Sequence, residues 1–323
     1  MDIDSLLIER YTVADEADWD KFVENSWNGT FLHQRKFLSY HQDRFMDYSL
    51  LIRSRKNGRV LALLPAALNP LDLNCVISHP GITYGGLLVG GDIYGSLLIS
   101  VFEKVFDILR NDGIRRFVYK PVPYIYHRIP MCDDVYALYR LNALKNRCDL
   151  SSTIDFFKRG EIYPNRLNKL RTSQKKQLRI SEGNEFLRDY WAIVEQVLFL
   201  KHNKKPVHSY EEIFLLAERF PNNIKCVVAF YQNKIIAGTV LFITTQVVHT
   251  QYLVADFDFG RRFHALDLVI EYVFNKYQNT QRRYLDFGIS TENDGYFLND
   301  GLYWFKRSFG SGSVVYESYQ VDL

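Results

Sequence analysis

One order of secondary-structure elements occurs twice in this chain, and it is the strongest constraint on the fold. In the first half, alternating apolar residues predict a hairpin over residues 48–68 and a pair of strands within residues 75–89. Apolar residues at helical spacing then predict a helix over residues 96–111, with Ser96 as its cap, and a strand follows over residues 116–120.

The second half repeats this order. A hairpin is predicted over residues 225–243, a strand over 247–254, a helix over 265–277 and a strand over 283–287. Corresponding elements lie roughly 170 residues apart. A duplicated α/β domain explains this pattern economically, and a length of 323 residues also favours two domains.

The segment between the two copies is predicted to contain a connecting strand over residues 136–150 and a helical segment that starts at Ser151. Three further helices are predicted, over residues 165–180, 184–202 and 209–219, and the last begins with a capping box of Ser209 and Glu212. We therefore predict two domains, residues 1–150 and residues 151–323.

Composition excludes several classes of protein. A hydrophobic fraction of 47% with 24% charged residues is typical of a globular protein and excludes a largely disordered one. A net charge of +3 is too small to predict a nucleic-acid surface. The N-terminus is acidic and no apolar run approaches the roughly 20 residues of a membrane span, so a cytoplasmic protein without a signal peptide is expected.

The cysteines indicate neither a metal site nor a disulfide framework. Cys75, Cys132, Cys148 and Cys226 are widely spaced and form no Cys/His ligand pattern. We therefore expect no metal and a reducing compartment.

Several segments together resemble the Fem-type proteins, a group of double-domain members of the GCN5-related N-acetyltransferase (GNAT) superfamily. The resemblance extends over nearly the whole chain and lies in residues 30–34 (TFLHQ), 78–87 (SHPGITYGGL), 285–290 (LDFGIS), 301–302 (GL) and 305–310 (FKRSFG). It implies an α/β fold of two tandem GNAT-like domains, each a mixed, largely antiparallel sheet flanked by helices.

Two activities follow from this resemblance. The first is transfer of an acyl group, acetyl or 3-hydroxybutanoyl, from coenzyme A to a nucleotide-linked amino-deoxy sugar such as a dTDP-3-amino-3,6-dideoxyhexose, for bacterial surface polysaccharide. The second is transfer of an amino acid from tRNA to a peptidoglycan precursor. Members that use tRNA commonly have a long helical arm, whereas residues 154–219 are broken by Pro164, Gly183 and Pro206, which favours the first activity. A catalytically inactive binding protein is a third possibility.

GNAT chemistry places the diphosphate of acyl-coenzyme A on the free amides at the start of a helix. The corresponding segment here precedes and opens the helix over residues 265–277. Its residues are Gly260, Arg261, Arg262, Phe263, His264, Ala265 and Leu266. Phe263 lies where the superfamily usually has glycine, and Arg261 with Arg262 could equally be a solvated pair.

The resemblance places the reacting atoms where the fourth and fifth strands of the domain separate. The candidate catalytic residues in these strands are His249, Tyr252, Asp286 and Glu292. Asp286, at a strand end beside a Gly-Ile-Ser turn, is the preferred base; the alternative is that it caps this turn. His249 could instead be a structural histidine, and a bound water could take the proton.

A nucleotide-sugar acceptor would need aromatic rings and cations. Candidate substrate-binding residues are His33, His79, Tyr84, Gly85 and Gly86 in the first domain, and Ser290, Tyr303 and Lys306, with Trp304, in the second. The aromatic content of 15% could supply such a surface or simply fill the core. The alternative for the last residues is a C-terminal helix that packs through its aromatic side chains.

Overall fold

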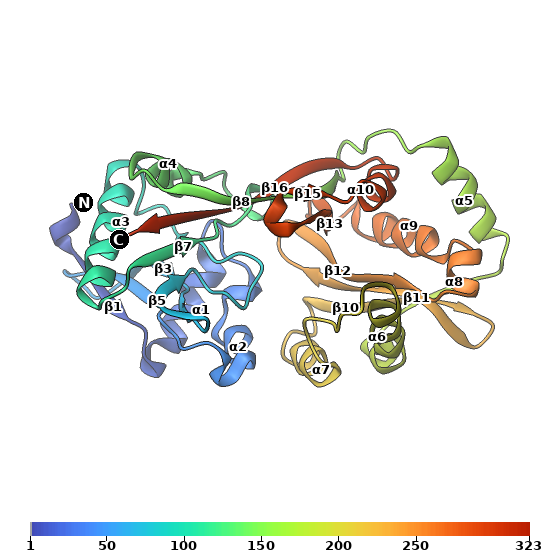
Figure 1. Cartoon of the computed structure of the whole chain (residues 1–323), viewed down its shortest axis with the longest axis horizontal. Coiled ribbons are helices and arrows are strands. Elements are labelled where there is room, and N and C mark those ends of the chain that lie inside the picture. The colour runs from blue at the N-terminus through green and yellow to red at the C-terminus, as the bar shows by residue number, and fades with distance from the viewer. Residues whose placement is uncertain (1) are drawn as a thin grey trace. The chain divides into compact units, whose positions relative to one another are not determined.

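The computed structural model describes residues 2–323, which form two compact units (Figure 1). Unit 1 contains the chain up to Asp149 together with Asn293–Tyr296 and Val315–Leu323. Unit 2 contains Leu150–Glu292 and Phe297–Val314. The chain therefore first passes from unit 1 to unit 2 after Asp149. The last nine residues, which the sequence analysis assigned to the second domain, belong to unit 1. They do so because strand β16 (Gly312–Asp322) pairs there with β7 (Arg116–Tyr119), far away in the sequence.

Unit 1 contains two groups of paired strands and a long buried helix. One sheet has the order β1 (Leu6–Arg10), β2 (Leu50–Ser54), β3 (Val60–Leu64), β6 (Leu88–Val89). The other group is β4 (Ala67–Asn69), β5 (Asp72–Ile77), β7 and β16. The helices are α1 (Glu16–Asn25), α2 (Arg35–Leu38), α3 (Gly95–Asn111) and α4 (Asp133–Arg140).

The core of unit 1 lies under α3. Leu98, Val101, Phe102 and Val105 recur at helical spacing and are all buried against strand residues such as Phe117. Burial of such side chains stabilises the fold by about 1.5–3 kcal/mol each. The predicted helix is therefore confirmed, although its cap residue is Tyr94 and not Ser96.

Unit 2 is built on a twisted mixed sheet with helices on both faces. Its strand order is β8 (Leu144–Asp155, from Leu150 onwards), β13 (Tyr284–Ile289), β12 (Val247–Ala255), β11 (Lys234–Ile243), β10 (Ile224–Tyr231), β9 (Arg179–Glu182). Helices α6 (Leu187–His202) and α7 (Tyr210–Arg219) cover one face, and α9 (Ala265–Tyr277) covers the other (Figure 1). The smaller elements are α5 (Pro164–Gln174), α8 (Phe259–Arg262), α10 (Asp300–Arg307), β14 (Thr291–Glu292) and β15 (Phe297–Leu298).

Most elements of the repeated pattern are present, and the errors fall between the two copies. The strand predicted over residues 136–150 begins only at Leu144, because residues 136–140 belong to α4 (Asp133–Arg140), and Ser151 lies inside strand β8 where a helix was predicted. The predicted helix over 165–180 ends at Gln174, because residues 179–182 pair with β10 instead. The capping box of Ser209 and Glu212 is confirmed in α7.

Strands β12 and β13 are joined over a short length only. They pair in parallel from Val247–Tyr284 to His249–Asp286, and both continue beyond that point without pairing to each other. On its other side, β13 has an irregularity between Asp286 and Ile289 in its pairing with β8. The two strands therefore separate just after His249 and Asp286.

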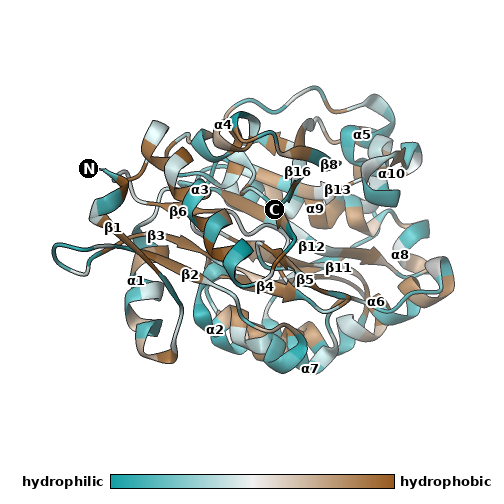
Figure 2. Ribbon diagram, turned by 60° about the vertical axis from the view of Figure 1, so that its left-hand side comes forward, coloured by the Kyte–Doolittle hydropathy of each residue, from teal (hydrophilic) through white to brown (hydrophobic). Residues whose placement is uncertain are grey.

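Apolar residues are concentrated on the strands (Figure 2). None of the helices within residues 2–323 is long and apolar enough to cross a membrane. In the same residues, no group of three or more His, Cys, Asp or Glu side chains could hold a metal ion.

Candidate active site

His249 and Asp286 form a close pair at the point where β12 and β13 separate. The His249 Nδ1 atom lies 2.7 Å from the Asp286 Oδ2 atom. Asp286 is fully buried, whereas the His249 side chain remains 14% exposed. The imidazole is therefore the member of the pair that solvent or a substrate can reach.

Two hydroxyl groups from β8 complete the surroundings of Asp286. Ser151 Oγ and Thr153 Oγ1 donate to Asp286 Oδ1 over 2.6 and 2.8 Å. Both hydroxyls reach the same carboxylate because alternate residues of a strand face the same side. Burial alone would raise the pKa of Asp286, but the hydrogen bond and charge of His249 and these two hydroxyls together lower it.

An ionised Asp286 determines which nitrogen of His249 carries a proton. The carboxylate accepts only, so Nδ1 of a neutral imidazole must be the donor, and Nε2 is left as the acceptor. The pair can therefore take up a proton at Nε2 while Asp286 stabilises the imidazolium that forms.

Gly288 makes room for the His249 ring. Its φ of +74° lies in the region that favours glycine, and a Cβ built there would lie 3.2 Å from His249 Cε1. The glycine of the predicted Gly-Ile-Ser turn thus positions the histidine.

Lys306 occupies the gap left by the separating strands. Its Nζ atom donates to the carbonyl oxygens of Gly288 and Ile289 over 2.9 and 2.6 Å, and the residue is only 5% exposed. Burial lowers the pKa of Lys306 to about 8, and the charge of Asp286 opposes this shift. Lys306 therefore satisfies carbonyls that have no strand partner on that side.

A pocket lies along another face of α10, the helix that contains Lys306. Its volume is about 350 Å³, and it is lined by Tyr163, Asn165, Arg166, Lys169, Gly301, Trp304, Phe305 and Ser308. Trp304 is 54% exposed, and its ring lies 6.1 Å from that of Tyr163.

Two cations give the pocket a positive character. Arg166 is buried, and it binds the Asp267 carboxylate over 2.8 Å and Ser308 Oγ over 2.9 Å. Lys169 forms no ion pair with any of the residues that the structure describes. A flat aromatic wall beside a lysine with a free charge suits a ligand that has both a ring and a phosphate.

The segment predicted to bind a diphosphate is used mainly for packing. A Cβ at Gly260 would lie 2.1 Å from the Ile236 carbonyl oxygen, so this glycine allows α8 to approach β11. Phe263 is buried against Tyr231 and Phe259, while Ala265 is fully buried. Arg261 stacks on the ring of Phe257 at 4.0 Å.

Two buried carboxylates contact this segment. Asp256 Oδ1 accepts from the Gly260 amide of α8 over 2.7 Å, and Asp267, in the first turn of α9, is paired with Arg166. His264 has a left-handed φ of 54°, and its pKa is lowered by burial and by the charges of Lys169 and Arg166. Asp256 therefore lies beside the loop amides, and the adjacent pocket contains the cations Lys169 and Arg166.

Two candidate catalytic residues lie in other surroundings. The Tyr252 hydroxyl lies 2.7 Å from His208 Nδ1, its ring packs on Trp191 of α6, and burial raises its pKa to about 12. Glu292 is exposed and accepts a hydrogen bond from Asn299 Nδ2 over 2.9 Å.

Asp286 itself differs from its prediction as a base that reaches the substrate. The sequence places it at a strand end beside a flexible turn, but three hydrogen-bond donors enclose it. Its position explains this difference, because β13 is a central strand with β8 on one side and β12 on the other.

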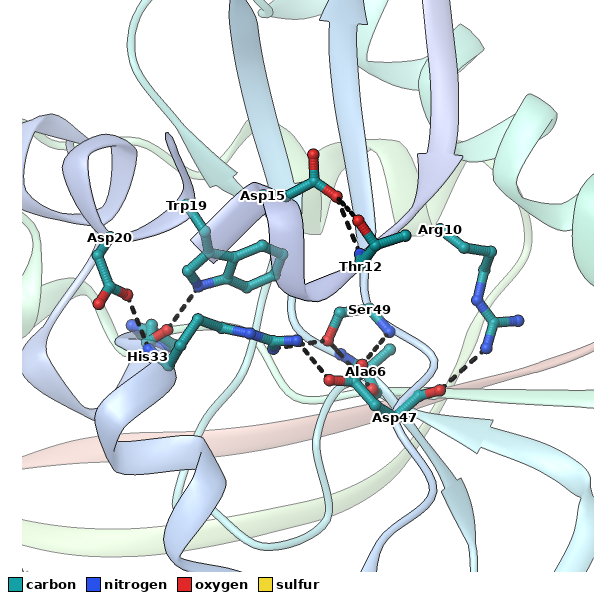
Figure 3. Close-up of polar contacts among 10 residues, drawn as sticks. Arg10, Thr12, Asp15, Trp19, Asp20, His33, Asp47, Ser49 and Ala66 are labelled. Atoms are coloured by element: carbon teal, nitrogen blue, oxygen red, sulfur yellow. Dashed lines mark hydrogen bonds and ion pairs between the residues drawn. The ribbon is translucent and has the colours of Figure 1, made fainter. Parts of the chain in front are cut away.

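The candidate residues of unit 1 form a buried structural cluster. Trp19 Nε1 donates to the His33 carbonyl oxygen over 2.8 Å, next to the buried Arg35, whose guanidinium binds Asp47 (Figure 3). Burial lowers the pKa of His33 to about 4 and that of His79 well below its usual value. Both histidines are therefore neutral at physiological pH.

The loop that contains the remaining unit 1 candidates is tightly packed. Tyr84 is buried, and a Cβ at Gly85 would lie 1.9 Å from the Ser78 carbonyl oxygen. Gly86 has a φ of +75°. Lys120, the residue after β7, donates to the His79 carbonyl oxygen of this loop over 3.2 Å. These contacts hold the loop in place, and none of its residues lines the pocket described above.

Ser290 and Tyr303 adjoin the candidate site without lining its pocket. Ser290 is buried, and its amide donates to the Leu150 carbonyl oxygen. Tyr303 lies on α10 beside Trp304, with 6.3 Å between the ring centroids. The predicted common face of Tyr303 and Lys306 is not a substrate face, because Lys306 points inwards to β13.

Sequence reasoning missed five residues of this site: Ser151, Thr153, Tyr163, Arg166 and Lys169. The alternation of Ser151 and Thr153 was a usable signal for a strand, but a helical segment was predicted to start at Ser151. The pairing of Arg166 with Asp267 could not be predicted, because the two residues are 101 positions apart.

No protein-family model matches the sequence, and it matches no curated protein. Solved structures do match. FemX aligns with a TM-score of 0.68 and 11% identity over 98% of this chain and 97% of that one. L-PGS from Bacillus licheniformis aligns with a TM-score of 0.61 and 10% identity over 94% of this chain and 90% of that one. A tandem GNAT protein from the clavulanic acid biosynthesis pathway aligns with 0.52 and 11% identity over 98% of each chain.

At such low identity the similarity shows the fold alone. The predicted fold class is confirmed: the chain has the tandem GNAT-like fold that FemX and the tandem GNAT protein share.

Proposed function

We propose that unit 2 transfers an acyl group from an activated donor to a primary amine, with His249 as the general base. The observation that supports this most directly is the 2.7 Å contact between His249 Nδ1 and the buried Asp286 carboxylate, where two parallel strands separate. A partly exposed imidazole held by a buried carboxylate is suited to proton transfer.

The proposed step uses the residues as follows. His249 Nε2 accepts the proton that the acceptor ammonium loses and releases it to solvent, and the free amine nitrogen then attacks the acyl carbonyl carbon. As the C–N bond forms and the bond from the acyl carbon to its leaving sulfur or oxygen breaks, the nitrogen loses a second proton to His249 Nε2, and His249 passes this proton to the leaving atom. Asp286 remains ionised and orients the imidazole throughout.

For the donor and acceptor, our first candidate is acyl-coenzyme A, with acetyl or 3-hydroxybutanoyl as the acyl group, and a nucleotide-linked amino-deoxy sugar. A thioester supplies an acyl carbon that is reactive enough for direct attack by an amine. The pocket on α10 supports a phosphate-bearing ligand, since Lys169 and Trp304 offer a cation and a stacking surface. The sugar and its nucleotide rest on the sequence resemblance. The four cysteines are free thiols, which agrees with a reducing, cytoplasmic compartment.

A second candidate is Fem-type aminoacyl transfer from tRNA to a peptidoglycan precursor. The buried Asp256 carboxylate supports it, because it accepts from the Gly260 amide in the segment expected to hold the diphosphate of coenzyme A and would repel that group there.

One experiment separates these candidates. The protein is incubated with acetyl- or 3-hydroxybutanoyl-coenzyme A and a panel of amino-sugar nucleotides, and free thiol is measured; parallel reactions contain aminoacyl-tRNA and a peptidoglycan precursor. Thiol release that depends on an amino sugar supports the first candidate, and aminoacylation of the precursor supports the second. Absence of turnover with every donor would instead indicate an inactive binding protein.

The role of His249 is tested with His249→Gln, with Glu292→Gln as the control. We expect a loss of about 10²- to 10⁴-fold in kcat/KM for His249→Gln. The residual rate should rise with pH as the acceptor amine loses its proton unaided. Equal rates for the two variants would contradict the proposal.

A further inference from the structure

The end of α6 and the loop after it expose large apolar side chains among lysines. Phe199, Leu200 and Val207 are 62%, 61% and 80% exposed. Lys201, Lys204 and Lys205 lie between them in the sequence and are also exposed. We call these six residues the α6 patch.

The fold holds the α6 patch outwards. Trp191 and Val194 of α6 are buried, so the helix is anchored before its last turn. Asn203 then adopts a left-handed conformation with a φ of 50°, which ends the helix. Directly after Val207, His208 is buried and bound to the Tyr252 hydroxyl. Both ends of this segment are therefore fixed to the body of unit 2, beside α7 (Figure 1).

The α6 patch has a local excess of positive charge. The sequence contains no Asp or Glu from Gln196 to Tyr210. None of the three lysines forms an ion pair with any residue that the structure describes. Three positive charges and three exposed apolar side chains thus share about one turn of helix and one short loop.

Lysines combined with exposed apolar side chains favour one kind of partner. A second copy of this chain would bring three lysines against three lysines, which like-charge repulsion opposes. An RNA strand would pair with the lysines but would gain little from exposed Leu and Val side chains. An anionic lipid surface accepts both, because apolar side chains enter the acyl boundary while lysines remain at the headgroups.

We propose that the α6 patch docks this protein on an anionic phospholipid bilayer. Each lysine near such a surface contributes about 1 kcal/mol, so the three lysines together account for about 100-fold in the partition coefficient. The surface is separate from His249 and Asp286, and the proposal does not depend on acyl transfer.

The test is co-sedimentation of the full chain with vesicles of phosphatidylcholine alone or of phosphatidylcholine mixed with phosphatidylglycerol. Binding is expected only to the anionic vesicles and should fall with added salt. Replacing the three lysines by Gln should lower the partition coefficient about 100-fold. Replacing Phe199 and Leu200 by Ser should lower it at least about 10-fold, because two large apolar side chains are lost.

Matched controls use equally exposed residues elsewhere. Leu71→Ser with Leu73→Ser removes apolar side chains that are 94% and 64% exposed in unit 1, and Lys56→Gln removes an exposed lysine there. These controls should bind as the wild type does. Circular dichroism of each variant checks that the fold is retained.

Several results would overturn the proposal. They are failure to bind anionic vesicles, equal binding to neutral vesicles, or equal losses in the control variants. Binding of single-stranded RNA that needs the lysines but tolerates Phe199→Ser and Leu200→Ser, without vesicle binding, would make the patch a nucleic-acid site. A dimer that the Ser variants dissociate would make it a subunit interface.

Discussion

His249 Nδ1 and Asp286 Oδ2 lie 2.7 Å apart in the last residue pair that joins β12 to β13. The separation of these two strands therefore begins at the side chains that can move a proton. Ser151 and Thr153 orient the carboxylate from β8, so three strands contribute to one proton-transfer unit.

We expect Asp286→Asn to lower kcat/KM by about 10²- to 10⁴-fold, measured with the best donor and acceptor pair. The amide oxygen can still accept from Ser151 and Thr153, so its NH₂ group faces His249 Nδ1. Nδ1 then becomes the acceptor, Nε2 holds the proton, and the base is lost. An unchanged rate in a folded Asp286→Asn variant would exclude this arrangement.

Gly288→Ala should impair activity more than stability. The positive φ costs about 1–2 kcal/mol for alanine, and the new Cβ would contact His249 Cε1 at 3.2 Å and displace the ring. Gly58→Ala is a matched control, because Gly58 has a φ of +70° with nothing within 4 Å. Both variants should lose similar stability in urea, but only Gly288→Ala should lose turnover. Equal turnover would contradict the positioning role.

Arg166→Ala should reduce the free energy of unfolding by about 3–5 kcal/mol, because it leaves Asp267 buried and unpaired. Arg166→Met combined with Asp267→Leu should recover most of this loss, since no charge remains buried. Arg59→Ala, which breaks the exposed pair with Asp92, should cost less than about 1 kcal/mol. Urea titrations followed by circular dichroism measure all three. Failure of the double variant to recover stability would show that Arg166 stabilises by packing on Phe305 and Phe309.

The stability of the protein should depend on Lys306 in alkaline solution. The pKa of Lys306 is about 8 in the folded chain and 10.5 without burial. The unfolded chain therefore binds more protons between these two pH values, so the folded state gains stability as pH rises through this window. Relative to Lys306→Met, the wild type should gain up to about 1 kcal/mol per pH unit. Parallel curves for the two proteins between pH 8 and pH 10.5 would contradict the lowered pKa.

Trp304→Ala should raise the KM of the phosphate-bearing substrate about 10-fold with little change in kcat, because stacking on an aromatic side chain is worth about 1–3 kcal/mol. Lys169→Gln should raise the same KM and weaken its salt dependence. Tyr139→Ala, which removes a side chain that is 76% exposed in unit 1, is the control and should change neither constant. A fall in kcat alone would indicate that α10 acts on the reaction centre and not on binding.

Local pattern made much of the fold predictable. The repeated order of hairpin, strand, helix and strand was recognisable because each element has its own periodicity, as in α3 and α9. His249 and Asp286 were both identified as candidates, since they lie on the strands that separate in the recognised fold.

Other features depended on partners that are distant in sequence. Residues 179–182 form β9 and residues 315–322 belong to unit 1 because β10 and β7 provide hydrogen-bond partners there. Local propensity contains no information about such partners.

What the sequence determined by itself was therefore the kind of fold and the two titratable residues at the strand separation. Only the tertiary structure decided their roles, because Asp286 is enclosed by donors from β8 and β12, 133 and 37 positions away. The same holds for the segment around the start of α9, where Gly260 packs on Ile236 and Asp267 pairs with Arg166, both partners that are distant in sequence. Burial and charge at a site are sums over neighbours that the chain brings together only when it folds.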